Sequence, residues 1–213
     1  MTKKQYLNNF HSTELADKIK KLYSCELITH DQYMNMNPRK SLIYQYFTID
    51  TFYYLDMIFD NEDYDYYDIG CGDNFFKKIY SDKFNVIGID TNDDADLHCT
   101  FEEFLSKNRN KVDRAFAINS LHFVPFERIK DRIIEYISMF KKDGKGLITF
   151  NIGMMNRLNK VHQTKYVFVE AMQSLKNDLK DKVDFFFVEI SDEGANGIDG
   201  TTKICFKVLE EIE

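Results

Sequence analysis

Between residues 64 and 209, short apolar segments alternate with segments of helical periodicity. Seven segments have the length and the β-branched and aromatic content of buried strands: Tyr64–Ile69, Asn85–Asp90, Asp96–Thr100, Arg114–Asn119, Leu147–Ile152, Val183–Ile190 and Thr202–Leu209. Four intervening segments favour helices: Phe75–Tyr80, Phe101–Lys107, Phe126–Phe140 and Asn156–Lys180. This alternation predicts an α/β three-layer sandwich, in which a mostly parallel seven-stranded sheet lies between two layers of helices.

The last two predicted strands are joined differently from the others. Only the loop Ser191–Thr201 separates them, and it contains three glycines and no helical periodicity. A parallel crossover needs roughly a dozen residues or more, usually in a helix, whereas a loop is enough between antiparallel neighbours. We therefore expect one antiparallel strand at the C-terminal end of the sheet.

The first 60 residues have a different pattern, because helical periodicity runs through them without strand-like segments. We expect one helix over Glu14–Leu27 and a longer one over Arg39–Phe59, which begins directly after a proline. The chain is therefore predicted to consist of an N-terminal helical extension, residues 1–60, and an α/β domain, residues 61–213.

The charge balance and the cysteine pattern limit the classes of function. The chain has 213 residues, with 28 Lys and Arg against 35 Asp and Glu, so that its net charge is −7. Neutralising phosphates requires a basic surface, and non-specific DNA binding is therefore not expected. The four cysteines form no C-x-x-C pair, which indicates free thiols in a reducing compartment rather than a disulfide framework or a zinc site. No other metal site is expected.

The apolar segments also bear on localisation. Residues 1–13 lack the apolar core of a signal peptide. The most apolar stretch, Ser41–Phe59, is interrupted by Gln45, Asp50, Thr51 and Asp56, whereas a membrane span needs roughly 18–20 nearly uninterrupted apolar residues. We expect a cytoplasmic protein without a membrane partner.

The strongest functional signal is the sequence Asp68-x-Gly70-x-Gly72, in which Asp68 lies at the end of the first predicted strand and the two glycines follow that strand. Two glycines in such a turn let the backbone approach a ligand and point its N–H groups toward it. Asp90 ends the next strand, 22 residues after Asp68. At a topological switch point these strand ends are neighbours, and a carboxylate there can accept hydrogen bonds from a ribose diol. The alternative is a structural glycine turn beside a solvent-facing aspartate.

These residues resemble the motifs of a known family, the class I S-adenosylmethionine-dependent methyltransferases. Asp68-Ile69-Gly70-Cys71-Gly72 is similar to its first motif, and Val86-Ile87-Gly88-Ile89-Asp90 to its second. Asn119-Ser120-Leu121-His122-Phe123-Val124 resembles the segment after the fourth strand, and residues 140–147 resemble the entry to the fifth. The resemblance covers residues 60–152 by motif and extends to residue 209 by topology. It implies a Rossmann-like fold and a methyltransferase that uses S-adenosylmethionine.

The resemblance also implies how the chain would bind this cofactor. Asp68 and the backbone of Gly70, Cys71 and Gly72 would hold the methionine part. Asp90 would bind the ribose hydroxyls, and Thr91 would flank it.

Four further residues have implied roles at the other parts of the cofactor. Thr100 and Phe101 would border adenine, and Asn119 would lie beneath the sulfonium and its methyl group. His122 is the candidate general base, because an unperturbed histidine titrates near neutral pH. The alternative is a His122 that packs against the following helix or caps it.

At three positions the sequence departs from known patterns. Asn74 stands in place of the family's third glycine; because asparagine tolerates left-handed backbone, we expect the turn to persist and count Asn74 among the cofactor-binding residues. Thr100 stands near the place of an acid that often binds the adenine amine. Phe75 occupies the position where a nicotinamide dinucleotide site has a glycine, which makes such an oxidoreductase the weaker alternative. The main alternative is a non-catalytic binding or assembly subunit of the same fold.

The acceptor side of the predicted site is less specified. We expect the acceptor to enter over the carboxyl ends of the strands, near the segments Asn35–Ser41, Gly153–Gln163 and Asp192–Thr201. No Pro-Pro-Tyr sequence follows Asn119, which disfavours the exocyclic amines of DNA bases. The sequence is compatible with a small molecule, a nucleotide or a protein as the acceptor. It does not specify the oligomeric state.

Overall fold

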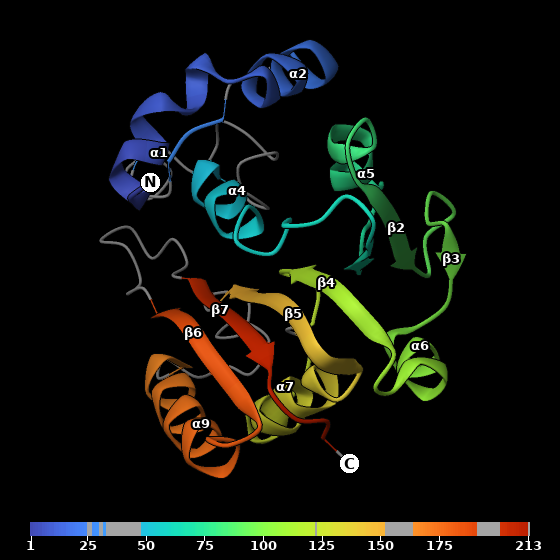
Figure 1. Ribbon diagram of the computed structural model, residues 1–213, viewed down its shortest axis with the longest axis vertical. Coiled ribbons are helices and arrows are strands. Elements are labelled where there is room, and N and C mark those ends of the chain that lie inside the picture. The colour runs from blue at the N-terminus through green and yellow to red at the C-terminus, as the bar shows by residue number, and fades with distance from the viewer. Residues whose placement is uncertain are drawn as a thin grey trace.

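The computed structural model describes residues 1–24, 27–29, 32, 48–121, 123–151, 164–190 and 201–212. Within this part of the chain the strands are β1 (Asp65–Ile69), β2 (Asn85–Asp90), β3 (Leu97–His98), β4 (Val112–Ile118), β5 (Phe140–Asn151), β6 (Val183–Ile190) and β7 (Thr201–Val208). They form one sheet in the order β3-β2-β1-β4-β5-β7-β6 (Figure 1). Strands β1 to β5 pair in parallel, and β7 is antiparallel to both β5 and β6. The predicted seven strands and the antiparallel C-terminal strand are confirmed.

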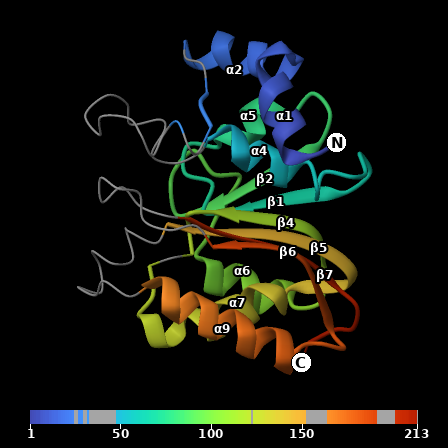
Figure 2. The ribbon, with the colours of Figure 1, turned by 90° about the vertical axis from the view of Figure 1, so that its left-hand side faces the viewer.

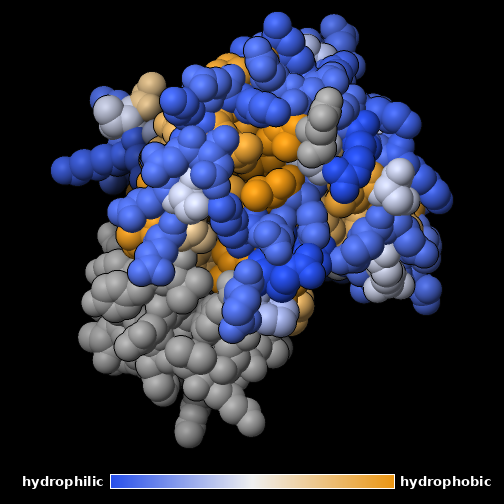
Figure 3. Space-filling model, turned by 90° about the horizontal axis from the view of Figure 1, so that it is seen from below, coloured by the Kyte–Doolittle hydropathy of each residue, from blue (hydrophilic) through white to orange (hydrophobic). Residues whose placement is uncertain are grey.

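Helices cover both faces of the sheet, so that the molecule has three layers (Figure 2). One face carries α1 (Lys3–Asn9), α2 (Glu14–Tyr23), α4 (Ile49–Leu55) and α5 (Phe75–Tyr80), with the short 3-10 helix η1 (Phe10–Ser12) between α1 and α2. The other face carries α6 (Phe101–Asn108), α7 (Ile129–Ile137) and α9 (Thr164–Asp178), and the 3-10 helix η3 (Phe126–Arg128) precedes α7. Seen from the side of α7 and α9, hydrophilic residues cover most of the described surface and apolar ones show between them (Figure 3).

The sheet separates two apolar cores. Along β4, Ala115 and Ala117 face the core under α6, α7 and α9, whereas Phe116 faces the core under the N-terminal helices. This alternation follows from the period of two along a strand. Both faces of a central parallel strand are therefore buried, as the nearly continuous apolar segments of the sequence require.

The N-terminal helices belong to the second of these cores. Phe10 of η1 packs against Phe52 of α4, with 5.6 Å between their ring centroids. Phe52 also packs against Phe76 of α5, with 5.9 Å between the centroids. Phe10 and Phe52 are at most 1% exposed. Buried aromatic pairs of this kind contribute strongly to packing, so that α1, η1 and α4 share one core with α5 and the sheet.

Four side chains, which we call the Glu189 network, also join the N-terminal helices to β6 and β7. Glu189 pairs with Lys203 at 2.8 Å and with Lys3 at 2.9 Å, and it accepts a hydrogen bond from the Tyr54 hydroxyl at 2.7 Å. Lys203 is only 3% exposed. Burial opposes ionisation of Glu189, but Lys203, Lys3 and Tyr54 outweigh it and lower the pKa of its carboxyl to about 2.

Two predicted helices in the N-terminal region have different bounds. The predicted continuous helix Arg39–Phe59 is wrong, because Thr48 has extended backbone (φ −125°, ψ 174°) and α4 spans only seven residues. The amide of Thr48 donates to the Thr51 hydroxyl at 3.4 Å, which marks a helix start at this point. The predicted helix Glu14–Leu27 ends at Tyr23, because Ser24 adopts left-handed backbone (φ 52°).

The fifth strand is longer than predicted. The helix predicted over Phe126–Phe140 ends at Ile137, and Phe140 begins β5. The segment Gly144–Gly146, predicted as the turn into this strand, lies inside it at a shift of register against β4. A Cβ on Gly146 would lie 2.5 Å from the Phe206 ring, so that the glycine is required by close packing within the strand.

Candidate functional site

The glycine turn lies at the carboxyl end of the parallel strands, between β1 and α5. Gly70 (φ 73°), Gly72 (φ 56°) and Asn74 (φ 60°) all have left-handed backbone, which glycine adopts freely and asparagine more readily than other residues. The amides of Gly70 and Cys71 donate to the Ile89 carbonyl at 2.7 and 3.2 Å. The turn therefore folds back over the ends of β1 and β2, and Asn74 has the conformation expected from the sequence.

The two glycines of the turn have different surroundings. A Cβ on Gly70 would lie 2.3 Å from the Cβ of Ser120, and the Ser120 hydroxyl donates to the Ile69 carbonyl. Around Gly72, no atom of the described residues beyond its chain neighbours lies within 4 Å of such a Cβ. Gly70 therefore lets the turn pack against the end of β4, whereas Gly72 leaves space in which a ligand can reach the backbone.

Asp90 lies at the end of β2, beside this open space. Its Oδ2 accepts a hydrogen bond from the Gly72 amide at 3.0 Å, and its Oδ1 accepts one from the Asn92 amide at 3.1 Å. Thr91 is exposed, and its hydroxyl lies 3.5 Å from Asp90 Oδ1. A carboxylate offers about four acceptor positions, so that Asp90 can accept further donors while the backbone holds it in place.

Asp68 is the buried carboxyl group of the site. It is 2% exposed, and its Oδ2 has no hydrogen-bond partner among the described residues. Burial, followed by the charges of Asp90 and Asp73, raises the pKa of Asp68 well above its ordinary value of 3.8. A buried carboxyl group without a donor is unfavourable, so that this position suits the cationic group of a ligand.

Asn119 reaches the same edge of the sheet from the end of β4. It has left-handed backbone (φ 53°), and its amide donates to the Thr149 carbonyl at 3.2 Å and to the Thr149 hydroxyl at 2.9 Å. The Thr149 hydroxyl in turn donates to Asn119 Oδ1 at 3.0 Å. Thr149, which is 3% exposed, thus fixes both the backbone and the side chain of Asn119.

Thr100 and Phe101 lie at the N-terminus of α6. The Thr100 hydroxyl accepts from the Glu103 amide at 3.2 Å, and the Glu103 carboxylate accepts from the Thr100 amide at 2.8 Å, which is a capping box. Phe101 is 9% exposed, and the Arg132 guanidinium lies 5.0 Å from its ring centre. The Phe101 ring therefore belongs to the core, and the place of both residues beside adenine stays a prediction.

Several predicted residues cannot be placed. His122 lies outside the described residues. So do the acceptor segments Asn35–Ser41 and Gly153–Gln163, and all of the segment Asp192–Thr201 except Thr201. The role of His122 as general base therefore stays a prediction.

The Cys71 thiol is not a nucleophile in this arrangement. Cys71 is 7% exposed, and burial, followed by the charges of Asp68 and Asp90, raises the pKa of its thiol to about 12. Only the thiolate is strongly nucleophilic. Both polar groups of its backbone are bonded within the protein, because the Cys71 amide donates to the Ile89 carbonyl and the Cys71 carbonyl accepts from the Asn74 amide.

Sequence reasoning missed the residues that hold the site together. Ser120 packs on Gly70, Thr149 holds Asn119, and Asp96 accepts a hydrogen bond from the Gly88 amide at 2.8 Å. The sequence did contain one signal for these contacts. Gly88 lies in the middle of the predicted strand Asn85–Asp90, and a glycine at such a position indicates that other atoms approach the backbone closely.

The comparisons with known proteins bear on the fold. No protein-family model matches the sequence, and no curated protein matches it. A putative S-adenosylmethionine-dependent methyltransferase from Listeria monocytogenes has a TM-score of 0.50 at 12% identity, over 75% of this chain and 98% of its own. The geranyl diphosphate C-methyltransferase of Streptomyces coelicolor A3(2), in complex with Mg²⁺, geranyl-S-thiolodiphosphate and S-adenosyl-L-homocysteine, has a TM-score of 0.54 at 11% identity, over 96% of each chain. A geranyl diphosphate methyltransferase in complex with S-adenosylmethionine has a TM-score of 0.53 at 11% identity, over 85% of this chain and 96% of its own.

This chain has the Rossmann-like fold of the class I S-adenosylmethionine-dependent methyltransferases. In this methyltransferase fold, the glycine turn, Asp68, Asp90 and Asn119 all lie at the carboxyl end of the parallel strands, which is where open α/β sheets bind ligands. At identities of 11–12% the likeness extends to the fold and not to the acceptor.

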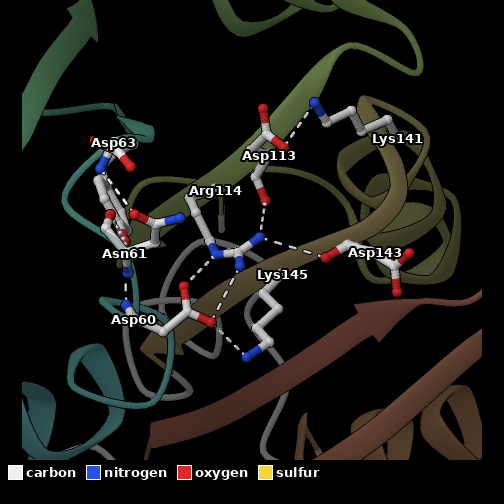
Figure 4. Close-up of polar contacts among 9 residues, drawn as sticks. Asp60, Asn61, Asp63, Asp113, Arg114, Lys141, Asp143 and Lys145 are labelled. Carbon is white, nitrogen blue, oxygen red and sulfur yellow. Dashed lines mark hydrogen bonds and ion pairs between the residues drawn. The ribbon is translucent and has the colours of Figure 1, made fainter.

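A second charged cluster of the methyltransferase fold lies at the opposite end of the sheet (Figure 4). Arg114 and Asp60 form a two-pronged ion pair, with Nε–Oδ1 at 2.8 Å and Nη2–Oδ2 at 3.0 Å. Arg114 also donates to the carbonyls of Asp113 and Asp143, and Lys145 pairs with Asp60. Because Arg114 of β4 and Lys145 of β5 both bind Asp60, this cluster joins these two strands to the chain before β1.

The described residues contain neither a metal-binding group nor a membrane-spanning helix. In this part of the chain, no group of three or more His, Cys, Asp or Glu side chains is placed to hold a metal ion. Across the same residues, no helix has the length and apolar character needed to cross a membrane.

Proposed function

We propose that this protein binds S-adenosylmethionine at the glycine turn and transfers its methyl group to an acceptor. The observation that carries the proposal is the pair of carboxyl groups on adjacent parallel strands. Asp68, whose buried Oδ2 has no hydrogen-bond partner among the described residues, suits the ammonium group of the methionine part. Asp90, held by two backbone amides, suits the two hydroxyls of the ribose. The methyltransferase fold of the chain supports this assignment.

The proposed complex uses the remaining site residues for contact and shape. The backbone of Gly70, Cys71 and Gly72 would approach the methionine part, because no side chain at Gly72 occupies the adjoining space. Thr91 would flank the ribose, and Thr100 with Phe101 would border adenine.

The chemistry requires alignment more than activation. When bound, S-adenosylmethionine supplies a methyl group that is already activated by its positive sulfur. The task of the protein is then to hold donor and acceptor in line and to exclude water. Asn119, held by Thr149, would orient the sulfonium end, and the acceptor would approach over the same strand ends.

A proton acceptor is needed only if the methyl acceptor loses a proton in the transition state. We propose His122 for this role, because it follows Asn119 by three residues in the sequence. Methyl transfer by a His122→Gln variant, compared with cofactor binding by the same variant, separates a base from a packing residue.

Isothermal titration with S-adenosylmethionine and S-adenosylhomocysteine tests the binding step. We expect dissociation constants below about 1 mM for both ligands, which corresponds to about 4 kcal/mol of binding free energy, and no binding of NAD. Binding of NAD alone would favour the oxidoreductase, and failure to bind either adenosyl ligand contradicts the proposal.

Transfer of radiolabelled methyl groups to pools of small molecules, nucleotides and proteins tests the second step. The likeness to the Streptomyces geranyl diphosphate C-methyltransferase covers 96% of this chain, so that the panel includes an allylic diphosphate. Tight cofactor binding without transfer to any pool would favour a non-catalytic subunit.

A further inference from the structure

Side-chain hydrogen bonds hold the end of the glycine turn against β2. Asn74 donates through Nδ2 to the Asp94 carbonyl at 2.6 Å and to Asp96 Oδ2 at 3.3 Å. The same Asp96 oxygen accepts the Gly88 amide at 2.8 Å, and Asp96 Oδ1 pairs with Lys77 of α5. We call Asn74, Asp96 and Gly88 the turn clip, because they join the turn, β2 and the β2–β3 connection.

Asn74 fits into the turn clip only because residue 88 is glycine. A Cβ on Gly88 would lie 2.0 Å from Asn74 Oδ1 and 2.7 Å from Asn74 Cγ. Asn74 is 6% exposed and immediately precedes α5. An asparagine at this position commonly caps the helix that follows, but here its side chain reaches across β2 instead. The amide of Asn74 thus fills the space that a side chain at position 88 would need.

The turn clip lies beside both carboxyl groups of the proposed site. In the pairing of β1 with β2, Asp68 lies opposite Gly88. The turn has two further attachments to β2. The amides of Gly70 and Cys71 donate to the Ile89 carbonyl at the start of the turn, and the Gly72 amide donates to Asp90, but Asp90 is the residue proposed to bind the ribose. Donors from a ligand would compete for this carboxylate, whereas the turn clip would keep its own hydrogen bonds.

We propose that Asn74 and Asp96 are positioning residues for the cofactor. They hold the glycine turn at the spacing from β2 that lets Asp68 and Asp90 bind opposite ends of one ligand. This inference rests on the proposed function, and it assigns the two residues a role through the turn rather than through contact with the ligand.

The first test replaces Asn74→Gly, which keeps the left-handed backbone available and removes the hydrogen bonds of the side chain. Asn110→Gly is the matched control, because Asn110 also has left-handed backbone (φ 52°) but precedes β4 at the other end of the sheet. We expect Asn74→Gly to lower the affinity for S-adenosylhomocysteine about tenfold and to speed hydrogen exchange of the amides of residues 70–74 in the free protein. Asn110→Gly should change neither.

The second test measures the coupling of the two positions. Gly88→Ala is expected to lower the affinity by more than tenfold, because its Cβ displaces the Asn74 amide. In the Asn74→Gly background, Gly88→Ala should cause little further loss, since the main remaining contact of its Cβ is the Cys71 sulfur at 2.7 Å, which can rotate away. Coupled residues show such non-additive effects, whereas independent ones do not.

A conservative change at Asp96 completes the comparison. Asp96→Asn keeps an oxygen that can accept the Gly88 amide, and it should retain more affinity than Asp96→Ala. A purely structural role would lower the unfolding temperature of both variants and leave the affinity of the folded protein unchanged.

The outcomes separate this inference from the proposed function. A wild-type protein that binds neither S-adenosylmethionine nor S-adenosylhomocysteine contradicts the proposed function, and the positioning role with it. A wild-type protein that binds, together with an Asn74→Gly variant of equal affinity or additive losses at positions 74 and 88, contradicts the turn clip alone.

Discussion

Asp68 and Asp90 are chemically identical side chains to which the fold gives different properties. Asp68 is 2% exposed with one oxygen unpartnered among the described residues, and its pKa is raised. Asp90 receives two backbone amides and stands beside the open space at Gly72. A cation and a diol are the groups that these two environments suit.

Asp90→Ala is expected to weaken binding of S-adenosylhomocysteine by about 1.5–3 kcal/mol, because it removes the charged acceptor of the ribose hydroxyls. Asp93→Ala is the control, since Asp93 is an exposed acid in the loop that directly follows β2. Calorimetric titration of both variants gives the comparison. Equal affinities of the two variants would contradict the assignment of Asp90.

The affinity of the wild-type protein is expected to depend on pH through Asp68. In the free protein burial, followed by the charges of Asp90 and Asp73, raises the pKa of Asp68, and the ammonium of a ligand would lower it again. Binding then releases a proton, so that the affinity rises with pH up to the raised pKa of the free protein and levels off above it. Titration in buffers of different ionisation enthalpy measures this release.

The variant Asp68→Asn provides the control for this proton release. It should bind more weakly than the wild-type protein and with no proton release over the same pH range. An unchanged pH dependence in Asp68→Asn would show that another group titrates.

At the scale of elements, the two glycines of the turn from β1 to α5 are required for different reasons. Gly70 packs on Ser120 from the end of β4, whereas Gly72 faces space that is open among the described residues and donates its amide to Asp90. One glycine thus serves packing between segments, and the other serves access to the backbone.

Alanine substitutions distinguish these two roles. Gly72→Ala is expected to lower the free energy of unfolding by about 1–2 kcal/mol, which is the cost of left-handed backbone for alanine. Gly70→Ala adds overlap with Ser120, and overpacking typically costs a further 1–3 kcal/mol. Urea unfolding of the two variants measures the difference, and equal stabilities would contradict the close packing of the turn on the end of β4.

The Glu189 network joins α1 and α4 to β6 and β7 through ion pairs and a hydrogen bond. Glu189→Gln removes the partner of Lys203, which is 3% exposed, and breaking such a pair is expected to cost about 3 kcal/mol of stability. Asp184→Asn, which changes an exposed acid of the same strand, should have little effect. Chemical unfolding at neutral pH tests this prediction.

The pH dependence of stability provides a second readout of the Glu189 network. Burial opposes the ionised form, but Lys203, Lys3 and Tyr54 lower the pKa of Glu189 from 4.5 to about 2. Its contribution to stability is therefore fully present above pH 4.5 and is lost as the pH falls toward 2. Glu189→Gln should lack this component of acid unfolding, and an unchanged acid profile would contradict the network.

At the scale of the whole molecule, local sequence patterns predict the sheet better than the helices of the N-terminal region. The bounds of β2, β6 and α5 agree with the predicted segments, because apolar runs between turn residues define them locally. The predicted helix Arg39–Phe59 failed because an extended residue within it, Thr48, interrupts the helical backbone. Its apolar periodicity gave no sign of that interruption.

In the candidate site too, the residues at strand ends could be predicted from the local sequence, whereas those that depend on contacts between distant segments could not. Asp68, the glycines and Asp90 were predictable, since each lies at the end of a predicted strand or in the turn that follows it. The supports were not, because Ser120 meets Gly70, and Asp96 meets Asn74, only after the chain has folded. A sequence pattern indicates the residues proposed to bind a ligand more readily than those that hold them in place.

We propose that one ligand joins Asp68 and Asp90 across the glycine turn, and a crystal structure of the protein with S-adenosylhomocysteine tests this proposal. We predict that the ammonium of the ligand lies about 3 Å from a carboxylate oxygen of Asp68 and that its ribose hydroxyls donate to Asp90. A ligand bound elsewhere on the molecule, or one that leaves the buried carboxyl group of Asp68 without a donor, would contradict the account.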